Sequence, residues 1–187
     1  MLIRPAHAED WPHIWPFFAR IVADGETYAY PDPITSDAAR ALWMEPPPGL
    51  TVVAVDEADG RVLGSAKVGP NRPGRGAHVS TASFMVDPAA QGRGVGRALA
   101  EYAVAWAREQ GYHSMQFNAV VETNTTAVRL WQALGFQILT TVPEAFDHAR
   151  HGLVGLHIMY LRLRPASASS RADHAVQPVS PQGTDPG

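Results

Sequence analysis

The segment FMVDPAAQGRGVG, residues 84–96, has the residue types and spacing of an anion-binding loop. An apolar strand runs into a turn, and a glycine-rich stretch then leads directly into an amphipathic helix. This arrangement points unpaired backbone N–H groups and the positive end of a helix dipole at one place. Such a place binds phosphate or pyrophosphate, and glycines let the anion approach the backbone without obstruction by a side chain.

The spacing of the glycines distinguishes this loop from two commoner phosphate-binding loops. A P-loop requires G-x-x-x-x-G-K-[S/T], a string that the chain lacks. A dinucleotide-binding loop requires G-x-G-x-x-G, and counting from Gly92 its third glycine would fall on Arg97. The chain instead has Q-x-x-G-x-G, from Gln91 to Gly96. A tight strand-to-helix connection with small residues for packing is the alternative interpretation.

A second motif, NTTAVRLWQALGF, follows at residues 124–136. It resembles the N-x-x-[A/S]-x-x-x-Y-x-x-x-G-F segment of the GCN5-related N-acetyltransferases (the GNAT superfamily), and the first motif resembles the acetyl-CoA loop of the same family. The two motifs come in the family's order and together cover about residues 79–141. The resemblance implies an α/β (α+β) fold whose central sheet is mixed but mostly antiparallel, with one splayed parallel pair of strands and helices on both faces.

The resemblance also implies how acetyl-CoA binds. The pantetheine arm would enter the cleft between the splayed strands and pair, like an added strand, with backbone groups of residues 84–86. Its diphosphate would lie on the N–H groups of residues 91–96, and nearby arginines would add charge unless they are merely solvated. The implied cofactor-binding residues are Phe84, Met85, Val86, Gln91, Gly92, Arg93, Gly94, Val95, Gly96, Arg97, Asn124, Ala127 and Trp131. For Asn124, a helix N-cap is an equally good interpretation and does not exclude cofactor binding.

The reaction that the resemblance implies is direct attack of a neutral amine on the thioester in a ternary complex. A backbone N–H of Phe84 or Met85 would stabilise the oxyanion. Trp131 departs from the family pattern, because many members carry there a tyrosine that can protonate the leaving thiolate, whereas an indole N–H has no useful acidity. Trp131 is therefore expected to pack on the cofactor or in the core, and solvent becomes a candidate acid.

Two branches of the family are nearest, the phosphinothricin and amino-acid N-acetyltransferases and the proline-analogue N-acetyltransferases. Thr81 falls where the first branch carries a glutamate base, and a threonine cannot serve as one. Asn118 and Asn124 match a pair of asparagines six residues apart in the second branch, where the first asparagine orients the substrate. The expected catalytic residues are Asn118 and Met85, and Glu122 is a weaker candidate base. The expected substrate-binding residues are Glu26, Tyr28, Tyr30, Thr81, Asn118 and His157.

Four alternatives remain open. A peptide or protein amine, or a polyamine, could replace an amino acid as the acceptor. The chain could instead be a non-catalytic acyl-CoA sensor, because Thr81 and Trp131 both depart from the usual catalytic types. For Asn118, a satisfied strand amide is the structural alternative, and for the tyrosines near residue 30 it is a surface loop.

Hydrophobic periodicity and chain breakers predict the elements that position these residues. The clearest is a helix over residues 95–110, in which Val95, Leu99, Tyr102 and Trp106 form one stripe. Further helices are expected at residues 10–23, capped by Asp10, at 36–44, capped by Ser36, and at 124–134. The expected strands are residues 2–4, 51–56, 61–68, 78–86, 114–120, 136–141 and 156–163.

Length and composition restrict the remaining possibilities. The chain has 187 residues, of which 45% are hydrophobic, and this suits one domain at residues 1–165 followed by a disordered Ser/Pro/Gly-rich tail at 166–187. A net charge of −3 argues against nucleic acid as a partner, and the absence of cysteine excludes disulfides and a cysteine nucleophile. The histidines at 148, 151 and 157 match no metal-ligand spacing, so no metal is expected. Lacking a membrane span and a signal core, the protein is expected to be cytoplasmic, with a homodimer possible.

Overall fold

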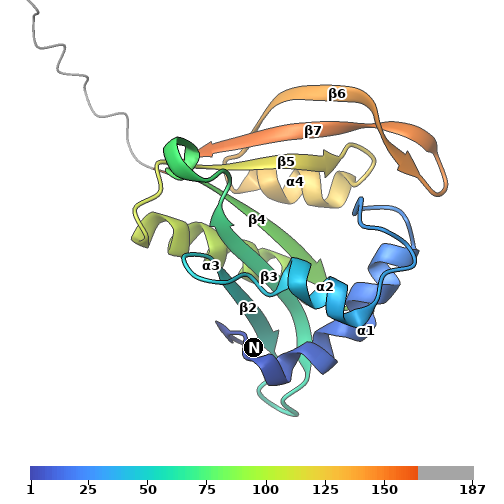
Figure 1. The fold of residues 1–187 in the computed structure, drawn as a ribbon, viewed down its shortest axis with the longest axis vertical. Coiled ribbons are helices and arrows are strands. Elements are labelled where there is room, and N and C mark those ends of the chain that lie inside the picture. Colours follow the sequence, from blue (N-terminus) through green and yellow to red (C-terminus); the bar gives the residue numbers. More distant parts are fainter. Residues whose placement is uncertain (164–187) are drawn as a thin grey trace, which may run out of the picture.

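The computed structural model describes residues 1–163, which form one seven-stranded sheet with helices on both faces (Figure 1). The strand order is β1-β2-β3-β4-β5-β7-β6, and β4–β5 is the one parallel pair among these strands. The strands are β1 (Leu2–Pro5), β2 (Leu50–Val55), β3 (Val62–Pro70), β4 (Val79–Val86), β5 (Ser114–Val121), β6 (Gln137–His148) and β7 (Gly152–Arg162). The helices are α1 (Trp11–Ala23), α2 (Ser36–Trp43), α3 (Val95–Glu109) and α4 (Thr125–Ala133), with short 3₁₀ turns at η1 (Ala8–Asp10), η2 (Gly74–Gly76) and η3 (Pro88–Ala90). The predicted fold class is confirmed, and the predicted tail lies outside the described residues.

The parallel pair separates almost as soon as it forms. β4 and β5 pair only at Val79 with Ser114 and at Ser80 with Met115, and beyond these residues the two strands diverge (Figure 1). On its other side β4 stays paired with β3 along its whole length, up to Val86. Beyond Ser80, the edge of β4 that faces β5 therefore carries backbone groups that pair with no other strand, as the resemblance implied.

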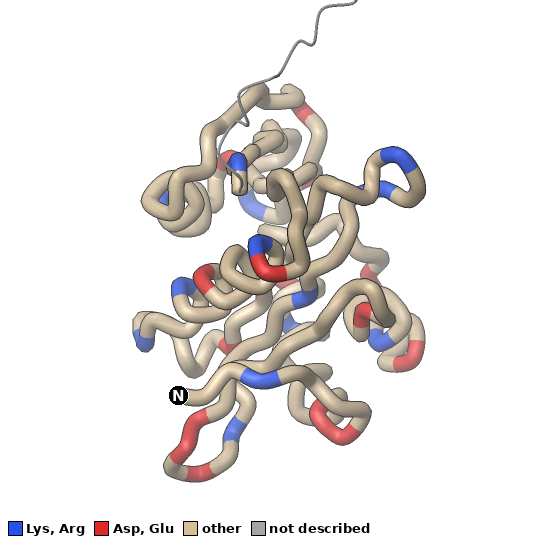
Figure 2. The backbone as a smooth tube through the Cα atoms, turned by 90° about the vertical axis from the view of Figure 1, so that its left-hand side faces the viewer, with Lys and Arg blue, Asp and Glu red and all other residues tan. Residues whose placement is uncertain are grey.

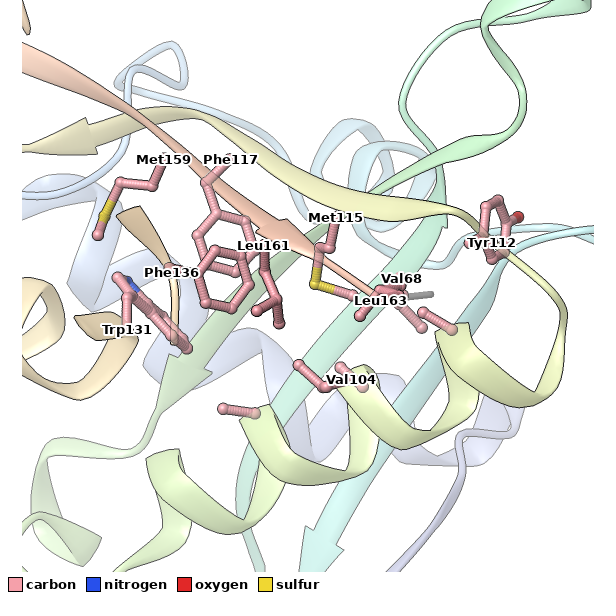
Figure 3. Packing of buried hydrophobic residues seen from close by; sticks show 13 residues of the cluster. Val68, Val104, Tyr112, Met115, Phe117, Trp131, Phe136, Met159, Leu161 and Leu163 are labelled. Atoms are coloured by element: carbon pink, nitrogen blue, oxygen red, sulfur yellow. The ribbon is translucent and has the colours of Figure 1, made fainter. Parts of the chain in front are cut away.

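Helix α3 covers one face of the sheet through small residues. The side chains of Leu99, Ala100, Ala103 and Ala107 are fully buried, whereas Tyr102 and Trp106 are only half-buried. The face of the helix predicted to be buried was therefore only partly right. The alanines let α3 lie close to the sheet, and the rings of Tyr102 and Trp106 lie at the margin of the contact. Next to the helix, Met115, Phe117, Trp131, Phe136 and Met159 belong to a cluster of buried hydrophobic residues that Figure 3 shows from close by.

Helices α1 and α2 cover the opposite face through an aromatic cluster. Phe18 and Trp43 are completely buried, and their rings meet edge to face with centroids 5.7 Å apart. The Trp43 indole donates to the hydroxyl of Ser65 on β3 at 2.9 Å, which fixes α2 to the sheet. Tyr28, a residue of the candidate site, packs against this cluster through Trp43.

Two predicted helix caps were wrong. Thr35, one residue before Ser36, caps α2 by accepting from the Ala38 N–H at 3.3 Å. Asp10 precedes α1, but its carboxylate makes two hydrogen bonds to Arg4 at 2.7 and 2.8 Å instead of capping the helix. Both errors arise because a sequence pattern shows that a cap-forming residue is present but not which partner competes for it.

The last two strands are much longer than expected. β6 continues to His148 and β7 begins at Gly152, so residues 142–155, for which the sequence predicts no element, form part of a long hairpin. Pro143 and a register shift between Val142 and Phe146 interrupt the alternation that would have revealed it. β6 is also an edge strand exposed along most of its length, so burial imposes little pattern on it.

Figure 2 shows acidic and basic residues interspersed along the described part of the chain in its view. No helix within residues 1–163 is both long and apolar enough to cross a membrane. Within the same residues, no three His, Cys, Asp or Glu side chains gather in a way that could hold a metal ion.

Candidate active site

The glycine-rich loop presents a row of free backbone donors. Gly92 and Gly94 have φ of 77° and 78°, a conformation that favours glycine, and they turn the chain into α3. The N–H groups of residues 92–96 donate to no acceptor in the described part of the chain, whereas Gln91 N–H bonds to the Pro88 carbonyl at 3.4 Å. A Cβ added at Gly92 or Gly94 would meet no atom within 4 Å, so the space beside these donors is open. The residues present therefore fit a diphosphate at a helix N-terminus.

Neither arginine of the loop is free to supply its whole charge. Arg93 forms an ion pair with Asp56 of the β2–β3 turn at 2.7 Å, and this guanidinium holds the pKa of the Asp56 carboxyl below its usual range. Arg97 lies 3.5 Å from Glu101, one helical turn further on. Both arginines are about half exposed, so their pairs contribute little, and the backbone donors remain the principal anion-binding feature.

The alternation of hydrogen bonds along β4 shows which backbone groups face the splay. The Asp87 N–H bonds to the Leu63 carbonyl and the Asn71 N–H to the Val79 carbonyl, and these two bonds fix the phase of the β3–β4 ladder. Met85 therefore directs its N–H toward β3, while Phe84 directs its own toward the splay. Of the two predicted oxyanion donors, the geometry favours Phe84 and disfavours Met85, whose side chain is also buried.

Tyr28 already occupies that position on Phe84. The Phe84 N–H donates to the Tyr28 hydroxyl oxygen at 3.0 Å, and the Tyr28 hydroxyl donates to the Phe84 carbonyl at 2.7 Å. The Tyr28 ring stacks on Tyr30, with centroids 5.4 Å apart and planes at 7°, and meets Trp43 edge to face. Burial raises the pKa of the Tyr28 hydroxyl far above its ordinary value, so the group is neutral and acts only as donor and acceptor.

Tyr28 also lines a cavity of about 610 Å³ between the α1–α2 segment and the β6–β7 hairpin. Its other lining residues are Val22, Ala23, Gly25, Ala29, Tyr30, Pro31, Asp32, Ala145, Phe146, Asp147 and Ala149. Two contacts join the walls: the Ala149 N–H bonds to the Gly25 carbonyl at 3.0 Å, and Arg150 pairs with Glu26 at 2.6 Å. Of the predicted substrate-binding residues, Tyr28 and Tyr30 thus line the cavity, and Glu26 joins its two walls.

Thr81 and Asn118 lie on the face of the sheet that α1 and α2 cover. Thr81 lies two and four positions before Ser83 and Met85, so it shares their face of β4. The exposed Asn118 side chain donates to the Asn71 side-chain oxygen at 2.6 Å and accepts from the Gln116 amide at 2.8 Å. Sequence reasoning missed Asn71, since nothing in the pattern indicates that the β3–β4 loop approaches β5.

The second motif forms the start of α4 and part of the core beneath it. Asn124 caps the helix by accepting from the Ala127 N–H at 3.1 Å, so the N-cap interpretation is confirmed. Trp131 is buried, and Figure 3 shows it beside Phe117, with ring centroids 4.8 Å apart. The centroid of the Phe84 ring also lies 4.8 Å from that of Trp131. Of the two placements expected for Trp131, the structure gives the core, and this core position lies directly beneath Phe84.

His157 and Glu122 are not brought to the acceptor side. His157 shares its face of β7 with Met159, which packs in the cluster beside α4, and its ring nitrogen lies 2.8 Å from the Thr141 hydroxyl. The predicted contact of His157 with the acceptor is therefore not supported. The Glu122 carboxylate accepts from the Gly155 N–H at 2.5 Å, so it serves the β5–β7 pairing and is a poor candidate base.

Comparison with known proteins agrees with this geometry. Residues 10–136 match the acetyltransferase (GNAT) family. A GCN5-related N-acetyltransferase from Kribbella flavida has 60% sequence identity and a TM-score of 0.84, over 86% of this chain and 96% of that one. The protein yncA from Salmonella typhimurium, solved with its cofactor acetyl-CoA, has 26% identity and a TM-score of 0.74, over 91% and 98% of the two chains.

Curated relatives match over different lengths. An L-methionine sulfoximine/L-methionine sulfone acetyltransferase of Pseudomonas paraeruginosa is 30% identical over 171 residues, which are 89% of this chain and 97% of the relative. The N-acetyltransferase aca1 of Schizosaccharomyces pombe is 36% identical over 100 residues, and the match spans only 47% of its length. The chain thus belongs to the GNAT family and is an N-acetyltransferase, a member of a family whose cosubstrate is acetyl-CoA.

Proposed function

We propose that this enzyme transfers the acetyl group of acetyl-CoA to the amine of a small molecule, an amino acid or an amino-acid analogue, by direct attack in a ternary complex. The neutral amine nitrogen attacks the thioester carbon, the C–S bond breaks, and the amide forms. The amine loses one proton to water or to a base, and the CoA thiolate takes one from solvent. A reference thiol pKa of about 8.5 makes solvent a sufficient acid near neutral pH.

The observation that carries this proposal is the alignment of a row of free N–H groups with an edge of β4 that no other strand covers beyond Ser80. The open N–H row of residues 92–96 follows the end of β4, and the edge of β4 that no strand covers runs back from it past Phe84, to which Tyr28 of the cavity wall is bonded. A diphosphate on the N–H row would place an extended pantetheine arm along this edge. The thioester would then reach Phe84, whose N–H faces the splay and can stabilise the oxyanion.

The acceptor class is supported by the relatives and by the cavity. Two relatives named for acetylating methionine sulfoximine and methionine sulfone match this chain over 97% of their own length. The cavity lined by Tyr28, whose hydroxyl bonds to Phe84, has about 610 Å³, a volume suited to a small molecule. Asn118, on the same face of the sheet as Thr81, is the proposed orienting residue for this acceptor.

A thiol-release assay tests the proposal directly. The enzyme is incubated with acetyl-CoA and single amines, including methionine sulfone, methionine sulfoximine, phosphinothricin, proline analogues, a polyamine and a peptide with a free N-terminus. Because the chain has no cysteine, a thiol reagent reports only free CoA. Release that depends on an amino acid or analogue supports the proposal, and release with only the polyamine or peptide contradicts its acceptor class.

The alternative of a non-catalytic acyl-CoA sensor rests on the two departures from the catalytic pattern. Thr81 cannot act as a base, and the buried Trp131 cannot act as an acid. A sensor would bind acetyl-CoA in calorimetry and release no thiol with any amine, which is the outcome that would favour it over the enzyme.

We also propose that the protein forms a homodimer through the outer side of the β6–β7 hairpin. The edge strand β6 exposes Ile138, Leu139 and Val142, and β7 adds Leu153, which is 62% exposed. A long apolar edge strand favours pairing with another chain, and a second copy supplies the same surface. Light scattering should give the parent twice the mass of one chain. The double variant that combines Leu139→Lys with Leu153→Lys should give the mass of one chain, and a monomeric parent would contradict the proposal.

A further inference from the structure

We propose that the Tyr28 hydroxyl is a placeholder on Phe84 that the thioester of acetyl-CoA displaces, so that loading of the cofactor reshapes the cavity that receives the acceptor. This inference rests on the proposed function, because it takes the splayed edge of β4 as the cofactor site. It adds a positioning residue that links the two substrate sites.

The two hydrogen bonds of Tyr28 give the first step of the argument. One hydroxyl occupies both the N–H and the C=O of Phe84, at 3.0 and 2.7 Å. An extended ligand that adds to β4 as a strand needs the same two backbone groups, from the same side. A single N–H cannot make a good hydrogen bond to the tyrosine and to a thioester oxygen in the same direction, so the two compete for one position.

The position of Tyr28 in the chain gives the second step. The backbone of β4 is paired with β3 on one side, and on the other side a partly buried Phe84 N–H without a partner would be unfavourable before the cofactor arrives. The Tyr28 hydroxyl removes this penalty in the free enzyme. The ring can serve in this way because the stack on Tyr30 and the edge of Trp43 hold it in place without help from other polar groups.

The cavity gives the third step. Tyr28 and Tyr30 line the cavity of about 610 Å³ that also contacts the β6–β7 hairpin through Phe146 and Asp147. Because the Tyr28 ring is a wall of this cavity, its hydroxyl cannot leave Phe84 without moving that wall. Cofactor binding and the shape of the acceptor cavity are thereby coupled, so acetyl-CoA should change the affinity of the enzyme for an acceptor.

Calorimetry on two matched variants tests the proposal. Tyr28→Phe keeps the ring and the stack but removes the hydroxyl, so acetyl-CoA no longer has a competitor at Phe84 and should bind up to about 10-fold more tightly than to the parent. Tyr102→Phe removes a tyrosine hydroxyl on α3 that makes no contact with Phe84 among the hydrogen bonds of residues 1–163, and its acetyl-CoA affinity should match that of the parent. Thermal melting confirms that each variant is folded.

The possible outcomes separate this inference from the proposed function. If the parent takes up no acetyl-CoA, the proposed function fails. If the parent binds and Tyr28→Phe binds equally or more weakly, the placeholder is refuted while the proposed function stands. Should Tyr28→Phe not fold, a crystal structure of the parent with acetyl-CoA decides: a cofactor oxygen on the Phe84 N–H with Tyr28 displaced supports the inference, and Tyr28 still bonded to Phe84 overturns it.

Discussion

Replacing Gly94 with alanine separates the anion-binding role of the loop from its backbone conformation. Gly94 has φ of 78° at the start of α3, and an added Cβ would meet no protein atom within 4 Å. Within the protein, the substitution therefore causes only the strain of a left-handed alanine, about 1–2 kcal/mol of unfolding free energy. In the proposed complex, however, the open space beside Gly94 holds the diphosphate.

The expected loss of affinity follows from the donors that the methyl group would block. Each hydrogen bond from a backbone N–H to a charged oxygen contributes about 1.5–3 kcal/mol. Displacing the diphosphate from two of the free N–H groups of residues 92–96 should therefore weaken acetyl-CoA binding about 100-fold or more. Isothermal calorimetry measures the affinity, and urea denaturation measures the free energy of unfolding.

Gly152→Ala is the matched control. Gly152 lies in the β6–β7 turn with φ of 66°, and an added Cβ there also meets nothing within 4 Å. This variant should lose a similar free energy of unfolding and keep the parent's acetyl-CoA affinity. If Gly94→Ala binds acetyl-CoA as tightly as Gly152→Ala does, the loop does not hold the diphosphate.

Three further substitutions have expected outcomes. Asn118→Ala should lower kcat about 10-fold or more because the acceptor loses its orientation, with little change in melting temperature since Asn118 is exposed; an unchanged kcat in steady-state kinetics would remove Asn118 from the mechanism. Arg93→Ala should weaken acetyl-CoA binding in calorimetry by no more than about 5-fold, because Arg93 is half exposed and paired with Asp56; a larger loss would mean that its guanidinium, and not the backbone, dominates. Asp10→Asn should lower the unfolding free energy at pH 7 by about 2 kcal/mol in urea titrations, because it weakens the pair with Arg4. The Arg4 hydrogen bonds lower the pKa of Asp10, so its stabilisation is complete above the unfolded value of about 3.9 and is lost as pH falls through the folded value; a difference from the parent that persists unchanged at pH 2 would contradict this reasoning.

The sequence predicted the elements whose signals are local. The glycine-rich loop, the Asn124 cap and the helix ends at Gly111 and Gly135 depend on backbone conformations that particular residue types favour, and both of these glycines have positive φ. The parallel pair and its splay followed from the resemblance, not from periodicity. What could not be predicted depends on partners distant in the chain.

The Tyr28 hydroxyl illustrates this limit. Its partner Phe84 is 56 residues away, and no spacing rule connects a loop tyrosine with the free edge of a strand. The same holds for Asn118 and Asn71, which are separated by 47 residues, and for the Gly25 carbonyl that receives Ala149. The expectation for His157 came from the resemblance, which does not tell which face of β7 its side chain occupies; in the structure it shares the face of Met159.

The most direct test of the central claim is calorimetry with acetyl-CoA and two shortened thioesters, S-acetyl-phosphopantetheine and S-acetyl-pantetheine. If the free N–H groups of residues 92–96 hold the diphosphate, the step from S-acetyl-phosphopantetheine to S-acetyl-pantetheine, which removes the last phosphate, should cause the largest single loss of affinity. S-acetyl-pantetheine should then bind at least about 100-fold more weakly than acetyl-CoA. Equal affinity for all three thioesters would contradict the account.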